Sequence, residues 1–193
     1  MNSLQKKGFV AAIHEAPLQK PFVEKLKKVS DEWLVAYEKE EQVFSQGMFD
    51  AKELMQQDVI SISDSEGNIV AFLNIIPDYS PKECTYDLIR KTADAPGGCM
   101  DALIVKLVEY AKEKDYDYIN MGLVPMTGIE EPNNPAEQLI KFAGKKLKRF
   151  KHYHGLRDFK EKYATYWKDK FLVYENDYDL LQLPLALNKV MQP

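Results

Sequence analysis

The stretch that decides the fold is residues 83–123, ECTYDLIRKTADAPGGCMDALIVKLVEYAKEKDYDYINMGL. Its middle predicts a helix that begins after Pro96-Gly97-Gly98, because apolar residues recur there at helical spacing. Strands are predicted on either side of that helix, at residues 83–89 and 118–123. A strand, a helix and a second strand in succession favour a mixed α/β domain. The apolar residues of the helix are Met100, Leu103, Ile104, Leu107, Val108 and Ala111.

The chain before this stretch predicts more strands and two helices. Residues 59–63 and 69–76 are predicted strands, joined by a polar hairpin turn. A short strand is predicted at residues 8–15. Helical spacing predicts one helix over residues 17–29, and Ser30 is predicted to act as the N-cap of a second helix.

After residue 123 the chain is predicted to hold a long polar loop, three helices and one more strand. We therefore expect a single domain over residues 1–193, in which helices flank a central mixed sheet. The loop is residues 125–135, the helices lie at residues 136–143, 156–162 and from Asp179, and the strand lies at residues 170–174.

Positive charge is concentrated in the last third of the chain. Eleven Lys/Arg and three Asp/Glu lie between Lys141 and Lys170, in a chain whose net charge is −4. This asymmetry favours an anionic partner, such as tRNA or lipid phosphate. A metal site is not expected, because the two cysteines and three histidines form no ligand motif. No stretch has the 18 or so apolar residues of a transmembrane helix, and no signal peptide is predicted.

The turn at residues 93–100 is a candidate anion site, because a glycine-bearing turn opens a helix whose first N–H groups lack partners. The order of elements resembles the GNAT acetyltransferases, in which the equivalent turn binds coenzyme A through a Q/R-x-x-G-x-G/A pattern. Here the turn reads ADAPGGCM and lacks that pattern, so coenzyme A is not expected. In the alternative interpretation, the glycines simply end a loop before a core helix.

Seven motifs in one order resemble the C-terminal acyltransferase half of the bacterial phosphatidylglycerol lysyltransferases. These multiple peptide resistance factors include alanyl-transferring relatives. The resemblance runs from about Gly8 to the end of the chain, with His152-Tyr153-His154 in place of the family's N-F-Q. The motifs read SDEWL (30–34), FSQGMFD (44–50), IVAF (69–72), DLIR (87–90), GCMD (98–101), NMGLVPMTG (120–128) and GLRDFKEKY (155–163).

The resemblance implies transfer of a lysyl or alanyl group from aminoacyl-tRNA to the glycerol hydroxyl of phosphatidylglycerol. That reaction alters membrane charge and resistance to cationic antimicrobial peptides, and it implies neither a metal nor a coenzyme. The implied partners are aminoacyl-tRNA and the anionic phospholipid, at the cytoplasmic face of the cell membrane. This chain itself is expected to be soluble, and the resemblance implies a preceding acyltransferase-like half and a membrane region outside it.

The resemblance also implies that Asp87 and Arg90 are catalytic, with Asp87 suited to the amino group of the aminoacyl moiety. Positions 87 and 90 point to opposite faces of a regular strand. Both line one pocket only if the strand ends or bulges near Leu88. The alternative is an Asp/Arg pair on the rim of the sheet.

Six further residues are candidates for substrate binding. Among them, Lys160 and Lys162 are candidates for the tRNA end or the lipid phosphate. The alternative is a solvated helix with the ion pairs Arg157/Glu161 and Asp158/Lys162. The six are Asn120, Thr127, His154, Arg157, Lys160 and Lys162.

Two of these six residues have an alternative of their own. His154 is either a general base, since the ordinary pKa of histidine is near neutrality, or an exposed histidine in a basic patch. Asn120 either lines the pocket or caps the end of a strand.

Two other classes of function stay open. One is an enzyme of the same fold with a different acceptor or an acyl-coenzyme A donor. The other is a non-catalytic module that docks to tRNA or to a membrane. Binding that falls with salt concentration, without turnover, would favour the docking module.

Overall fold

The computed structural model describes residues 2–38, 40–43, 47–76, 79–124, 138 and 148–192. The chain divides into two compact units, residues 1–120 with 191–193, and residues 121–190. The single domain expected from the sequence stays a prediction.

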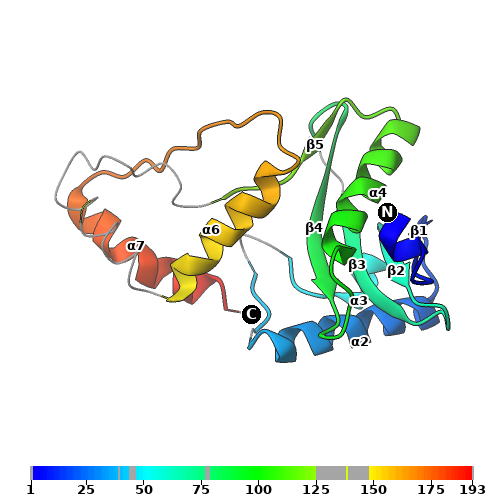
Figure 1. Cartoon of the computed structure of the whole chain (residues 1–193). Coiled ribbons are helices and arrows are strands. Elements are labelled where there is room, and N and C mark those ends of the chain that lie inside the picture. The colour runs from blue at the N-terminus through cyan, green and yellow to red at the C-terminus, as the bar shows by residue number, and fades with distance from the viewer. Residues whose placement is uncertain are drawn as a thin grey trace. The chain divides into compact units, whose positions relative to one another are not determined.

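A five-stranded mixed sheet forms the centre of the first unit (Figure 1). Neighbouring strands from β1 to β4 are antiparallel, whereas β5 is parallel to β4. The parallel pair requires a crossover connection, which α4 (Cys99–Glu113) supplies. The predicted mixed α/β fold is therefore confirmed. The strands, in spatial order, are β1 (Val10–His14), β2 (Asp58–Ser63), β3 (Ile69–Ile76), β4 (Glu83–Lys91) and β5 (Tyr118–Asn120).

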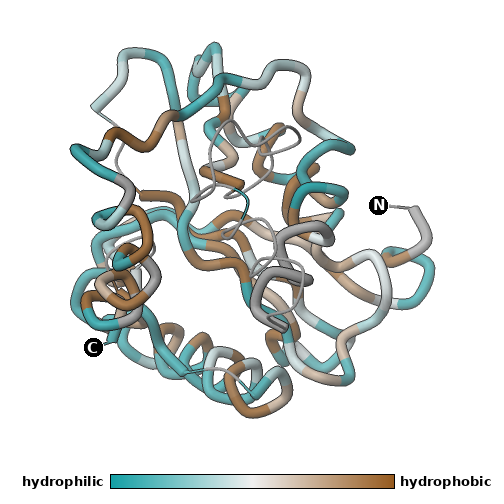
Figure 2. Tube along the Cα trace, turned by 90° about the vertical axis from the view of Figure 1, so that its left-hand side faces the viewer, coloured by the Kyte–Doolittle hydropathy of each residue, from teal (hydrophilic) through white to brown (hydrophobic). Residues whose placement is uncertain are grey.

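Helices cover the two faces of this sheet. The helix α2 (Lys20–Ala36) packs on β3 and β4, over the face that carries Phe72 and Leu88. The helix α4 packs on β1 to β4 over the face that carries Ile62, and its side chains Leu103 and Leu107 are fully buried. Successive side chains of a strand alternate between faces, so strands covered on both faces are apolar along their length, as Figure 2 shows.

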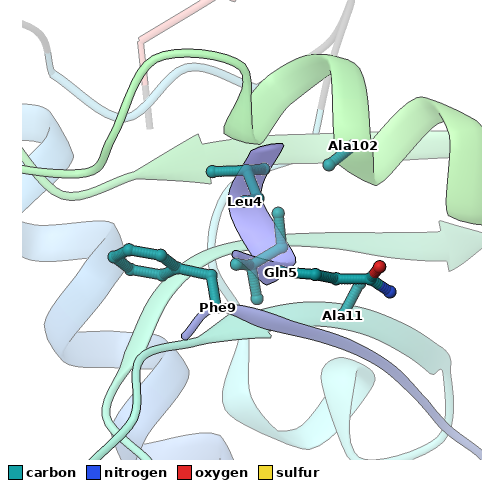
Figure 3. Close-up of a pocket in the computed structure, with 6 residues that line it drawn as sticks. Leu4, Gln5, Phe9, Ala11 and Ala102 are labelled. Atoms are coloured by element: carbon teal, nitrogen blue, oxygen red, sulfur yellow. The ribbon is translucent and has the colours of Figure 1, made fainter. Parts of the chain in front are cut away.

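Two short helices complete the described part of the first unit, α1 (Asn2–Gln5) and α3 (Ala51–Leu54). Asp50 caps α3, because its carboxylate accepts the N–H groups of Lys52 and Glu53. A small pocket lies between α1, the start of β1 and α4 (Figure 3). Its volume of about 10 Å³ has room for about one water molecule, so this pocket is a packing gap and not a substrate site. It is lined by Leu4, Gln5, Phe9, Ala11, Ile62 and Ala102.

One helix, α2, occupies the region in which the sequence predicts two. The predicted N-cap role of Ser30 is wrong, because Ser30 is buried in the middle of α2 and its hydroxyl accepts a hydrogen bond from Arg90. The helix instead begins after Gln19, with Pro21 in its first turn, a position that proline tolerates well.

The second unit contains α6 (Lys148–Glu161) and α7 (Asp177–Val190). The predicted strand at residues 170–174 is wrong, because these residues have no regular secondary structure and no neighbouring strand accepts their hydrogen bonds among the described residues of the unit. The predicted loop at 125–135 lies outside the described residues, as does nearly all of the predicted helix at 136–143. Of the helices that the structure describes, none combines the length and apolarity needed to cross a membrane.

The register between β3 and β4 changes opposite Asn74, where Asp87 and Leu88 of β4 face one residue of β3. An extra residue of this kind is a β-bulge, and it shifts the alternation of the side chains that follow. Arg90 pairs with Phe72, which belongs to the core beneath α2. Asp87 and Arg90 therefore share the face of the sheet that α2 covers, and of the two conditions stated for a common pocket, a strand end or a bulge near Leu88, the structure has the bulge.

The side chain of Asn74 holds the bulge in place. Its Oδ1 accepts the N–H of Leu88 at 2.6 Å, and its Nδ2 donates to Oε1 of Gln57 at 2.8 Å. Asn74 is buried, so an unpaired Leu88 N–H would lie away from water. The amide side chain thus replaces the strand-to-strand bond that the bulge interrupts.

We expect Asn74→Ala to lower the free energy of unfolding by about 1–3 kcal/mol, because it leaves the Leu88 N–H without an acceptor. Urea denaturation measures this change. Gln56→Ala, which truncates an exposed amide side chain of the same unit, should change the free energy by about 0.5 kcal/mol or less. Equal effects of the two substitutions would contradict a structural role for Asn74 at the bulge.

Candidate functional site

Asp87 is half-buried on β4 and contacts the segment that precedes α3. The N–H of Gly47 lies 2.9 Å from both carboxylate oxygens of Asp87. A Cβ atom at position 47 would lie only 2.1 Å from Oδ2 of Asp87. The glycine of the FSQGMFD motif is therefore required by the close approach of backbone to carboxylate.

The carboxylate of Asp87 keeps unused capacity to accept hydrogen bonds. Its two oxygens share one N–H donor, and no ion pair of Asp87 occurs within the part of the chain that the structure describes. An ionised carboxylate offers about four lone-pair positions. A ligand's ammonium group is the kind of donor that would fill them.

Arg90 is buried, with 2% of its surface exposed, and its hydrogen-bonding groups face protein atoms. Its two terminal nitrogens donate to Oε1 and Oε2 of Glu41 at 2.8 and 2.7 Å, and one of them also donates to Ser30. The guanidinium carbon lies 4.9 Å from the centroid of the Trp33 ring. A bidentate ion pair and an aromatic face therefore fix Arg90 in place.

Glu41 is the residue of this site that the sequence analysis missed. Burial alone would raise the pKa of Glu41, but hydrogen bonds and charge from Arg90 outweigh that effect. The N–H of Phe49 at 3.3 Å and the charge of Lys27 also lower the pKa, so the pKa of Glu41 lies below its ordinary value. Glu41 thus stays ionised near neutral pH. No local pattern signals this pairing, because 49 positions separate Glu41 from Arg90.

Asn120 lies at the end of β5, beside the start of β4. Its backbone oxygen accepts the hydroxyl of Thr85 at 2.9 Å, and its Nδ2 donates to Oε1 of Glu83 at 2.9 Å. Both contacts tie β5 to β4 where the two strands pair. These bonds match the strand-end alternative for Asn120.

The glycine-bearing turn before α4 is shaped by its backbone. Gly98 is the N-cap of the helix and has φ 89°, a conformation that side-chain-bearing residues rarely adopt. The N–H of Cys99 already donates to the oxygen of Pro96 at 3.3 Å. These two observations favour the interpretation in which the glycines end a loop before a core helix.

In the second unit, Lys160 is almost completely buried, with 6% of its surface exposed. Its Nζ donates to the backbone oxygen of Leu123 at 3.1 Å, next to Gly122. Burial lowers the pKa of Lys160 from 10.5 to about 8. The solvated-helix alternative is therefore wrong for Lys160, whose helix turns this residue inward.

Arg157, on the same helix as Lys160, and Lys162, in the turn just after that helix, both reach solvent. Nε of Arg157 forms the predicted ion pair with Oε1 of Glu161 at 3.5 Å. Nζ of Lys162 lies 5.5 Å from the centroid of the Phe159 ring. The backbone of residue 154 belongs to α6, but the side chain of His154 lies outside the description, as does all of Thr127.

The structure brings Asp87 and Arg90 onto one face of the sheet in the first unit, and Asn120 of β5 pairs with Thr85, two positions before Asp87 on β4. In the second unit, Arg157 and Lys160 lie on α6, and Lys162 lies in the turn that follows this helix.

Comparisons with known proteins identify a family that this chain matches. Residues 1–174 match the family model described as "Phosphatidylglycerol lysyltransferase, C-terminal". A phosphatidylglycerol lysyltransferase of Bacillus subtilis (strain 168) is 34% identical over 181 residues, which cover 93% of this chain and 21% of that protein. The chain thus spans about a fifth of the length of that curated relative.

Solved structures agree on the fold. A structure of L-PGS from Bacillus licheniformis matches with a TM-score of 0.82 and 32% identity, over 98% of this chain and 57% of the other. A ribosomal-protein-alanine N-acetyltransferase from Brucella melitensis is 16% identical with a TM-score of 0.51, over 87% of this chain and 99% of the other. The second likeness supports only the fold, and it agrees with the acetyltransferase-like architecture expected from the sequence.

We expect Glu41→Ala to lower the free energy of unfolding by about 3 kcal/mol, because it leaves the buried Arg90 without its carboxylate. Glu40→Ala is the matched control, since Glu40 is an exposed acid one position away. It should change the free energy by less than about 0.5 kcal/mol. Chemical denaturation measures both, and a Glu41→Ala protein as stable as the control would contradict the ion pair.

The buried Lys160 predicts a particular dependence of stability on pH. Its folded-state pKa of about 8 lies below its ordinary value of 10.5, so the unfolded chain binds more protons between these values. We expect the wild type to gain about 2–3 kcal/mol relative to Lys160→Met as pH rises from 8 towards 10.5. In the matched comparison, Lys162→Met should track the wild type. A constant difference between wild type and Lys160→Met would show that Lys160 titrates normally.

Proposed function

Because the chain belongs to the phosphatidylglycerol lysyltransferase C-terminal family, we propose that it transfers a lysyl group from lysyl-tRNA to phosphatidylglycerol. The match to the family over residues 1–174 carries this proposal. The name of the Bacillus subtilis relative specifies lysine, which favours lysyl over the alanyl group that the sequence leaves open. The product adds positive charge to the membrane at its inner face, and thereby resistance to cationic antimicrobial peptides.

The proposed reaction exchanges one ester for another. The glycerol hydroxyl oxygen attacks the carbonyl carbon of the lysyl ester, and the bond from that carbon to the ribose oxygen of tRNA breaks. The proton of the lipid hydroxyl ends on the departing ribose oxygen. One carbon–oxygen bond forms and one breaks, so the balance of the step needs no further reactant. The oxyanion that develops at the carbonyl calls for nearby cations and N–H donors.

We assign to Asp87 the recognition of an amino group of the lysyl moiety. Its carboxylate is half-buried, lies at a bulge, and has acceptor capacity beyond the single N–H of Gly47. Partial burial strengthens a charge-assisted hydrogen bond to an ammonium group. The contact would hold the ester carbonyl in the orientation needed for attack. Such positioning lowers the activation barrier because the reacting groups no longer have to find that geometry by chance.

Arg90, which the sequence analysis groups with Asp87, takes a positioning role in this proposal. Its guanidinium is committed to Glu41 and Ser30 and is covered by Trp33. Glu41 in turn accepts the N–H of Phe49, so the pair ties the segment around Gly47 to β4. Arg90 therefore acts on the substrate through the placement of that segment.

Arg157 and Lys162 are the proposed contacts for the phosphates of tRNA or lipid. Arg157 reaches solvent on α6 and Lys162 does so in the turn just after it, both in the basic third of the chain. Lys160 is buried against Leu123, and we propose that it organises the backbone at Gly122 within the NMGLVPMTG motif. Asn120 and Thr127 stay proposed substrate-pocket residues because they lie near a predicted strand end, and His154 stays one because the ordinary pKa of histidine suits a general base.

The test is transfer of label from lysyl-tRNA, with alanyl-tRNA in parallel, to phosphatidylglycerol vesicles by the purified chain. We expect Asp87→Asn to lower turnover by about 10- to 100-fold, because it removes the charge that holds the ammonium group. Asp94→Asn is the matched control, since Asp94 is an exposed acid in the turn after β4, and it should retain full turnover.

Two results would count against the proposal. Unchanged turnover in Asp87→Asn would refute the role assigned to Asp87, although the proposed reaction itself would still stand. Salt-sensitive tRNA binding by the wild type without any lipid product would favour the docking module instead.

A further inference from the structure

The second unit exposes a run of bulky apolar side chains between α6 and α7. Every residue of segment 165–173 is exposed, and five of the nine are aromatic or aliphatic. Phe171 and Val173 are 84% and 90% exposed. The other three are Tyr166, Trp167 and Leu172.

Segment 165–173 is unusual for a connection that lacks secondary structure. Connections on a protein surface are normally rich in polar and turn-forming residues. Holding several large apolar side chains in water is unfavourable, by an amount that grows with their exposed area. A contiguous exposed apolar stretch of this kind marks a surface that a partner covers.

The charge of segment 165–173 indicates the kind of partner. Lys168 and Lys170 flank a single acid, Asp169. Nζ of Lys168 lies 5.9 Å from the centroid of the Tyr166 ring, within the range of a cation–π contact. Tyrosine and tryptophan combined with lysine are the residues enriched where a bilayer meets water, because each has an apolar body and a polar end.

We propose that segment 165–173 inserts into the surface of a bilayer that contains anionic phospholipid. Phe171 and Val173 enter the boundary of the acyl chains, Trp167 lies at the level of the headgroups, and Lys168 and Lys170 contact lipid phosphates. The choice of a membrane over a polypeptide rests on this composition and on the proposed function, whose acceptor is itself a membrane lipid.

The test is flotation of the 193-residue chain with vesicles of phosphatidylglycerol and phosphatidylcholine, or of phosphatidylcholine alone. We expect Phe171→Ser/Val173→Ser to lower partitioning into the mixed vesicles by about tenfold or more. Lys168→Gln/Lys170→Gln should lower it by a similar factor, and only where the anionic lipid is present.

The matched control, Tyr79→Ser/Val35→Ser, removes two equally exposed apolar side chains from the first unit and should leave partitioning unchanged.

Tryptophan fluorescence locates the contact within the chain. The mixed vesicles should shift the emission of the wild type to shorter wavelength, because Trp167 enters a less polar environment. This shift should disappear in Trp167→Phe and persist in Trp33→Phe. A shift that follows Trp33 would place the membrane contact elsewhere and overturn the proposal.

Two further results would overturn the proposal. One is a failure of the partitioning test, in which Phe171→Ser/Val173→Ser partitions as well as the wild type or the wild type does not partition at all. The other is self-association of the wild type that Phe171→Ser/Val173→Ser abolishes, since the segment would then contact a second copy of the chain.

Turnover on a monomeric, short-chain phosphatidylglycerol separates this proposal from the proposed function. No bilayer is present in that assay, so Phe171→Ser/Val173→Ser should turn over as fast as the wild type. Absence of turnover by both would refute the proposed function, while the vesicle measurements would still decide the membrane contact.

Discussion

The hydrogen bond from the N–H of Leu88 to the side chain of Asn74 is the interaction on which the site of the first unit depends. An inserted residue in a central strand leaves a buried backbone donor without a partner, and a bulge of that kind persists only where another group accepts the bond. Asn74 supplies that acceptor from the neighbouring strand. The bulge then turns Asp87 onto the face that Arg90 occupies, which a regular strand does not allow.

The two side chains that the bulge brings to one face hold the same segment by different means. Asp87 accepts a hydrogen bond from the N–H of Gly47. Arg90 binds Glu41, which also accepts a hydrogen bond from the N–H of Phe49. A buried guanidinium is costly unless it is paired, and the bidentate contact with Glu41 meets that requirement. The division of labour follows from these contacts: Arg90 is fully engaged by protein groups, and Asp87 keeps capacity for a ligand.

The sequence predicts the parts of this structure that depend on local spacing. The sheet and the helix after Gly98 follow from apolar periodicity, whereas a bulge enters only as one of two conditions under which positions 87 and 90 could share a pocket. Contacts between distant residues carry no such signal. Ser30 fits the local pattern of an N-cap. That pattern cannot show that the Ser30 hydroxyl accepts a hydrogen bond from Arg90, which lies 60 positions later. Glu41 and Asn74 were missed for the same reason, and the burial of Lys160 was not predicted because a basic helix gives no sign of which lysine turns inward.

Amide hydrogen exchange at Gly47 tests the dependence of the site on the bulge most directly. A loop amide exchanges through local opening, so a loss of global stability alone does not change its rate. If Asn74 positions Asp87, and Asp87 holds the Gly47 N–H, then Asn74→Ala should accelerate exchange at Gly47 by about tenfold or more, although no bond of Gly47 itself is altered. Exchange at Gly47 that is the same in Asn74→Ala and the wild type would contradict this account.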